Sequence, residues 1–131
     1  MNASTNIAKR VNELIDKYSN SPNSVQYLLC DQYPPNKLAY KIINENMEEY
    51  DLSYGELKTQ SILIANGLKQ RGVKKGDRIA TLMGKSKEYI ITLLAIWRIG
   101  AVHVPLFTAF STPAITLRAV SYTHLTLPTT G

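Results

Sequence analysis

Cysteine is nearly absent from this sequence, and its scarcity sets the first limits on the protein. Cys30 is the only one among 131 residues, so no disulfide can form within the chain. Free thiols are typical of the reducing cytoplasm, and we expect a cytoplasmic protein. Histidine is scarce too. His103 and His124 are far apart and neither stands at a ligand spacing from Cys30, so we expect no metal site.

Long apolar runs are also missing. The longest run, residues 89–97, is interrupted by Thr92 and is far shorter than the roughly 20 residues that a membrane-spanning helix needs. Residues 1–10 lack the basic start and the apolar centre of a secretory signal. We therefore expect neither a membrane span nor secretion.

Charge is limited, because 15 Lys and Arg oppose 10 Asp and Glu to give a formal net charge of +5. Basic residues gather around 69–78, and one interpretation is a phosphate or nucleic-acid patch. No aromatic residue alternates with them, as single-stranded nucleic acid requires, and cations at a helix end complement the helix dipole. We favour a solvated helix end and expect no nucleic-acid partner. A small basic anion-binding module remains the alternative, which steeply salt-dependent retention on heparin would favour.

Hydrophobic residues make up 44% of the chain, enough for one core, and they recur at helical or strand spacing. A helical stripe opens the chain, and a short helical piece follows at 25–30. Residues 38–43 and 47–52 indicate two strands paired as a hairpin. The apolar segments 78–83 and 101–106 indicate buried parallel strands. The residues of the opening stripe are Ile7, Val11, Leu14, Ile15 and Tyr18.

Capping residues mark the expected helix boundaries. Ser53 and Glu56 form a capping box, in which the hydroxyl and the carboxylate each satisfy a free amide. The other boundary residues are Gly72 and Gly100, expected to end helices, and Ser86 and Pro113, expected to begin them. A helix over 87–99 between two strands makes a strand–helix–strand unit, so the expected fold class is α/β.

Two features suggest chemistry but have simpler interpretations. Residues 83–86 read Met-Gly-Lys-Ser after a strand and before a helix, as in a phosphate loop. The glycine that such a loop needs five residues earlier is replaced by Ile79, so we expect only a helix cap. His103 lies between valines in a strand, and no serine, cysteine or carboxylate is placed for a catalytic relay. We expect a hydrogen-bonded or half-buried histidine rather than a catalytic base.

Three segments carry a resemblance to a known family: Leu-Ser-Tyr-Gly-Glu-Leu at 52–57, Gly-Val-Lys-Lys-Gly-Asp-Arg at 72–78, and Ile-Trp-Arg-Ile-Gly-Ala-Val-His-Val-Pro-Leu at 96–106. Together they resemble the N-terminal part of the adenylate-forming (AMP-binding) synthetases. Residues 95–103 and 107–111 are most similar to the acetyl-CoA and propionyl-CoA synthetase branch. The resemblance covers roughly residues 24–118. It implies the N-terminal portion of the family's large α/β domain, an incomplete sheet with flanking helices.

The resemblance implies an ATP-dependent acyl-CoA synthetase, which converts a carboxylic acid, ATP and coenzyme A into acyl-CoA, AMP and pyrophosphate with Mg²⁺. A short-chain acid is the expected substrate. An amino-acid adenylation domain or an aryl-CoA ligase is the alternative within the superfamily. The family's phosphate loop, its adenine and ribose motifs and its catalytic lysine have no counterpart here. We therefore expect a fragment that is inactive as given, holds no catalytic residue and binds no cofactor tightly.

The resemblance implies one set of cofactor-binding residues. In the acetyl-CoA branch, the segment matching Phe107, Thr108 and Ala109 lies beside the coenzyme A nucleotide. Phe107 matches the stacking aromatic residue, whereas Thr108 and Ala109 replace two glycines. The alternative interpretation makes Phe107 a core residue at a strand end.

The expected organisation has three parts: an N-terminal helical lead over 1–23, a partial AMP-binding synthetase domain over 24–118, and a tail over 119–131. The tail contains no Asp, Glu, Lys or Arg and departs from the family pattern. We interpret it as a foreign or frameshifted extension and predict that it is poorly ordered. The central part should expose strand edges and be marginally stable by itself.

Overall fold

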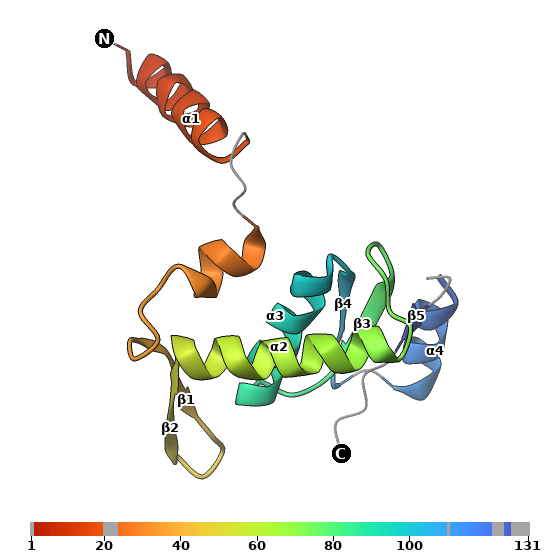
Figure 1. Ribbon diagram of the computed structural model, residues 1–131. Helices are drawn as coiled ribbons and strands as arrows, with labels where there is room; N and C mark the ends of the chain where they lie inside the picture. Colours follow the sequence, from red (N-terminus) through yellow and green to blue (C-terminus); the bar gives the residue numbers. More distant parts are fainter. Residues whose placement is uncertain (1, 20–23, 110, 122–124, 127–131) are drawn as a thin grey trace.

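The computed structural model describes residues 2–19, 24–109, 111–121 and 125–126 (Figure 1). An α-helix, α1 (Ala3–Ser19), opens the chain, and a π-helical turn, η1 (Tyr27–Asp31), follows it. The remaining elements are the strands β1 (Leu38–Ile43) and β2 (Glu49–Ser53), helix α2 (Tyr54–Gln70), strand β3 (Arg78–Leu82), helix α3 (Lys87–Ile99), strand β4 (Val102–Leu106), helix α4 (Thr112–Ser121) and strand β5 (Leu125–Thr126).

The strand–helix–strand unit forms as predicted. Strands β3 and β4 pair in parallel, with Ile79 opposite His103 and Thr81 opposite Pro105, and α3 connects them. Strand β5 pairs with the other side of β3, so the strand order is β4-β3-β5. The β1–β2 pair is the predicted antiparallel hairpin.

Helices cover both faces of the β3–β4 sheet, which confirms the α/β fold class. On one face, Ile79 packs among apolar residues of α2 and α3, and on the other face Ala80, Val104 and Leu106 pack against Ile115 of α4. Because successive strand residues point to opposite faces, the neighbours Ile79 and Ala80 of β3 belong to different cores. In the view of Figure 1, α3 crosses behind α2, and the two helices are in contact.

A second apolar cluster joins the hairpin to the helices. It contains Cys30, Leu52, Leu57, Ile91 and Leu94. Trp97 is partly buried and packs against both this cluster and the one around Ile79. The two clusters are therefore continuous through Trp97 and through Ile64, which also packs against both.

A charged pair fastens η1 to α3. Arg98 donates from Nη1 to Asp31 Oδ2 at 2.8 Å, and its Nη2 bonds the other carboxylate oxygen. Arg98 Nε also donates to Ser61 Oγ of α2 at 2.8 Å. The Arg98 and Asp31 side chains are only 10% and 20% exposed. The hydrogen bond from Arg98 lowers the pKa of Asp31, so the pair is ionised at neutral pH.

The predicted caps begin both long helices. Ser53 Oγ accepts from the Glu56 amide at 3.1 Å, and Ser86 Oγ accepts from the Tyr89 amide at 3.2 Å. The return arm of the capping box differs from the prediction, because the Glu56 carboxylate accepts from Lys87 Nζ at 3.2 Å. An ion pair with the start of α3 thus replaces the local bond.

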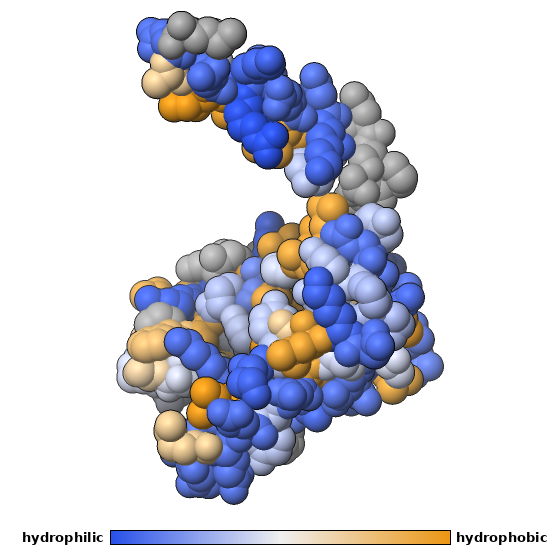
Figure 2. Space-filling view, turned by 90° about the vertical axis from the view of Figure 1, so that its left-hand side faces the viewer, coloured by the Kyte–Doolittle hydropathy of each residue, from blue (hydrophilic) through white to orange (hydrophobic). Residues whose placement is uncertain are grey.

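Helix α1 forms where the apolar stripe predicted it, but none of its residues is buried. Figure 2 shows it standing apart from the rest of the molecule, with hydrophobic side chains gathered on one side. Its stripe residues remain 39–65% exposed. Among the described residues, no helix combines the length and apolar character needed to cross a bilayer.

The tail predicted at 119–131 is described only in part. Residues 119–121 belong to the last turn of α4 and Leu125–Thr126 form β5, while 122–124 and 127–131 lie outside the described residues. The foreign origin and poor order of this segment therefore stay predictions.

Candidate functional site

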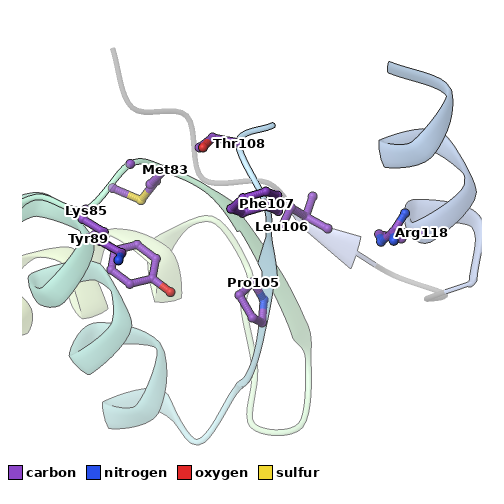
Figure 3. Close-up of a pocket in the computed structure, with 9 residues that line it drawn as sticks. Met83, Lys85, Tyr89, Pro105, Leu106, Phe107, Thr108 and Arg118 are labelled. Atoms are coloured by element: carbon purple, nitrogen blue, oxygen red, sulfur yellow. The ribbon is translucent and has the colours of Figure 1, made fainter. Parts of the chain in front are cut away.

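A cavity of about 440 Å³ opens where β3 and β4 end (Figure 3). Parallel strands direct their carboxyl ends to one edge of the sheet, and this edge is where ligands bind in open α/β sheets. A concave, mainly apolar cavity with a few polar groups is the usual form of a small-molecule site. Its lining residues are Met83, Gly84, Lys85, Tyr89, Pro105, Leu106, Phe107, Thr108 and Arg118.

Two of the three predicted cofactor-binding residues line this cavity. Phe107 and Thr108 directly follow β4 and contribute to its wall, whereas Ala109 is exposed outside the lining set. The Phe107 side chain is 63% exposed, which does not fit the core interpretation. The binding role of the three residues stays a prediction.

Lys85, Tyr89 and Arg118 also line the cavity, although the sequence did not single them out as site residues. A signal existed for two of them, since Lys85 follows the carboxyl end of a predicted strand and Tyr89 lies in the first turn of the next helix. Nothing local to α4 indicated that Arg118 would face the same space. Residues 83–86 form no phosphate loop, and Ser86 caps α3 as predicted.

The charge in the cavity is positive. Lys85 and Arg118 are the two basic side chains among its described lining residues, and none of those residues is Asp or Glu. Arg118 Nη1 donates to the Ala114 carbonyl at 3.1 Å, which fixes the guanidinium on α4. In the view of Figure 3, Phe107 lies between Lys85 and Arg118. An exposed ring with cations around it suits a planar ligand that carries negative charge.

Behind one wall of the cavity lies a hydrogen-bonded pair of side chains. Thr81 Oγ1 is 2.7 Å from His103 Nε2, and the ring centroid of His103 is 6.0 Å from that of Tyr89 in an edge-to-face arrangement. Burial lowers the pKa of His103, so its imidazole is neutral at pH 7. The sequence predicted a hydrogen-bonded or half-buried histidine, and His103 is both.

A smaller cavity of about 320 Å³ lies between the hairpin and the start of α3, lined by Ile42, Asn44, Tyr50, Lys85, Ser86, Lys87 and Glu88. Its polar groups are largely engaged within the protein. Asn44 Nδ2 and the Tyr50 hydroxyl both donate to Glu48, and Lys87 donates to Glu56. The larger cavity is the better candidate for a ligand site.

Comparison with known proteins agrees with the fold. Residues 29–121 match the AMP-binding enzyme family. The acetyl-coenzyme A synthetase of Chlorobaculum tepidum is 45% identical over 83 residues, which is 63% of this chain and 13% of that protein. The acetyl-coenzyme A synthetase of Emericella nidulans is also 45% identical over 83 residues, covering 62% of this chain and 12% of that protein.

A solved structure shares the same arrangement. The acyl-CoA synthetase of Brucella canis superposes with a TM-score of 0.80 at 28% identity, over 89% of this chain and 23% of that one. This chain thus spans a small part of the length of its relatives. The match over most of its residues shows that the chain belongs to the AMP-binding enzyme family.

Proposed function

We propose that these residues are the N-terminal part of an ATP-dependent acyl-CoA synthetase that acts on a short-chain carboxylic acid. The names of the relatives support this proposal, since both matched synthetases are acetyl-CoA synthetases. ATP, Mg²⁺ and the acid are proposed substrates and cofactors of the intact enzyme. The cytoplasm is the proposed compartment, because Cys30 is a free thiol among the described residues.

The cavity at the end of β4 is the proposed site for the nucleotide of coenzyme A. The single observation that carries this proposal is the exposed Phe107 ring, which lines a cavity that also holds Lys85 and Arg118. An aromatic face stacks on a purine, and cations bind its phosphates. Thr108 forms the adjoining wall, and Ala109 continues the segment that the acetyl-CoA branch uses.

The chain's own role in the reaction is to bind and orient. Coenzyme A, when bound, supplies the thiol that displaces AMP from an activated acid. Phe107 would hold the base end of that molecule, and the two cations would offset its phosphate charge. No catalytic residue is assigned here.

Binding of coenzyme A to the 131-residue chain tests the site. We expect weak binding, seen as shifts of cavity resonances in an NMR titration. Phe107→Ala should weaken it about tenfold, as loss of one base–aromatic stack does. Tyr27→Ala is the matched control, because Tyr27 is an exposed ring on η1 outside the cavity. Equal binding by the Phe107 variant and the wild type would refute the site.

Turnover tests the reaction class. The 131-residue chain with acetate, ATP, Mg²⁺ and coenzyme A should form no acetyl-CoA above the blank, and acid-dependent pyrophosphate release would contradict this. A longer protein containing this segment should release pyrophosphate with acetate or propionate. Preference for an amino acid or an aromatic acid would instead identify an adenylation domain or an aryl-CoA ligase.

A further inference from the structure

We propose that His103 is a positioning residue for the cavity: held by Thr81, its neutral imidazole fixes the Tyr89 ring that forms one wall, and protonation weakens ligand binding there. The ligand named for this cavity rests on the proposed function. The link between His103 and Tyr89 rests on the structure alone.

The three side chains come from three elements that meet on one face of the sheet. Thr81 on β3 is 1% exposed, and the register sets it opposite Pro105, the next residue of β4 on the same face as His103. Its hydroxyl oxygen lies 2.7 Å from the imidazole Nε2. A bond this short to a fully buried partner on the neighbouring strand leaves the imidazole little freedom to turn.

Tyr89 connects this pair to the cavity. The Ser86 cap fixes its backbone in the first turn of α3, and its ring meets His103 at an interplanar angle of 66°. Tyr89 lines the cavity, whereas His103 and Thr81 do not. Figure 3 shows Tyr89 on α3 and Pro105 on β4, and both residues form part of the wall. His103 therefore acts on the cavity only through Tyr89.

The protonation state matters because the half-buried position of His103 disfavours a charged imidazole. Thr81 faces it from β3 and Tyr89 from α3, and burial is the only cause that lowers the imidazole pKa. The charged groups of the cavity, Lys85 and Arg118, are both cations. An imidazolium must donate from both nitrogens and is better solvated by water. Protonation therefore draws the ring outward and removes the support behind Tyr89.

The variants are designed to separate positioning from simple packing. His103→Gln keeps an amide that can bond Thr81 but gains no proton in the acid range. His103→Leu fills similar space and loses the bond. Thr81→Val removes the same bond from the other strand, and it serves if either histidine variant fails to fold.

The experiment follows Tyr89 and coenzyme A binding by NMR in the 131-residue chain between pH 7.5 and pH 5. Without ligand, the Tyr89 ring resonance should move with the His103 titration in the wild type and stay constant in His103→Gln. Coenzyme A affinity should fall with pH about two- to tenfold more in the wild type than in His103→Gln, the size of one aromatic contact. The phosphate of coenzyme A also titrates in this range, with a second pKa of about 6. Its effect on affinity is the same for the wild type and His103→Gln, so the difference between the two proteins reports on His103.

At pH 7.5, His103→Leu should bind more weakly than the wild type, and His103→Gln should restore most of the affinity. A Tyr89 resonance that ignores the His103 titration overturns the proposal, as does equal pH dependence in wild type and His103→Gln. If the wild type binds no coenzyme A at any pH, the proposed function fails. The Tyr89 titration then decides the positioning role by itself: movement supports it, and constancy overturns it.

Discussion

Arg98 and Asp31 are 67 residues apart in the chain and form an enclosed, two-pronged ion pair. Arg98→Met should lower the free energy of unfolding by about 3 kcal/mol, because it leaves a desolvated carboxylate without its partner. The matched control is Arg10→Met, whose pair with Glu13 is 71% and 51% exposed and should matter by less than about 0.5 kcal/mol. Urea unfolding at pH 7 measures both. Equal stability of the two variants would contradict this account.

The same pair predicts an acid-dependent loss of stability. Arg98 holds the pKa of Asp31 below its ordinary value, so folding favours the ionised carboxylate. Its contribution is full above about pH 5 and is lost as pH falls through the ordinary value of about 4 toward the lowered one. Melting temperatures from pH 6 to pH 3 should fall less steeply for Asp31→Asn than for the wild type. Parallel curves would show that another carboxylate governs acid unfolding.

Single residues differ in how far the sequence reveals them. Ser53 and Ser86 were predicted as caps because a cap depends on neighbours three residues away. The Asp31–Arg98 bond was not predicted, since its partners meet only when η1 and α3 come together in the fold. Phe107 came from resemblance to a family, and only the fold showed that its ring is exposed at a cavity.

At the scale of elements, Gly100 at the end of α3 and Gly67 within α2 differ in how each should respond to replacement by alanine. Gly100 has a φ of +77°, and a Cβ there would lie 3.0 Å from Lys75 Cγ, so Gly100→Ala should cost about 1 kcal/mol or more. Gly67 lies in α2 with nothing within 4 Å of a Cβ, so Gly67→Ala should stabilise the chain by about 0.5–1 kcal/mol. Thermal unfolding followed by circular dichroism distinguishes the two. Shifts of the same sign would refute the assignment of Gly100 as a left-handed helix end.

Whole elements were predictable where their signals are local. The range 87–99 predicted for α3 is confirmed, because Ser86 and Gly100 bracket one apolar run. The pairing of β5 with β3 was not predicted, because Leu125–Thr126 are two residues of the tail that we interpret as a foreign extension. Pairing between distant segments depends on tertiary contacts, which no window of sequence contains.

For the molecule as a whole, α1 should be dispensable for stability. Removing residues 1–19 should leave the melting temperature unchanged within about 1–2 °C, because none of those described is buried and burial supplies most folding free energy. Removing residues 1–37 is the control, which also deletes Cys30 and Asp31 and should unfold the chain. A large loss in the shorter deletion would mean that α1 packs on the body in solution.

The location of the candidate site follows from a rule about parallel sheets, but its composition does not. Placing a cavity at the ends of β3 and β4 needs only the strand order and direction. Arg118 and Lys85 line the same cavity. This depends on α4 packing through Ile115 on the face of the sheet that carries Ala80 and Val104. The sequence could therefore indicate the edge but not the full set of side chains.

Trp97 is the only tryptophan in the chain, and it touches both apolar clusters. Its fluorescence is thus a built-in reporter of whether the hairpin half and the sheet half remain joined. Were the hairpin to detach while the sheet survived, the emission would shift to longer wavelengths before the helical signal declined. One optical trace beside a circular-dichroism melt would show whether this small protein comes apart in one step or in two.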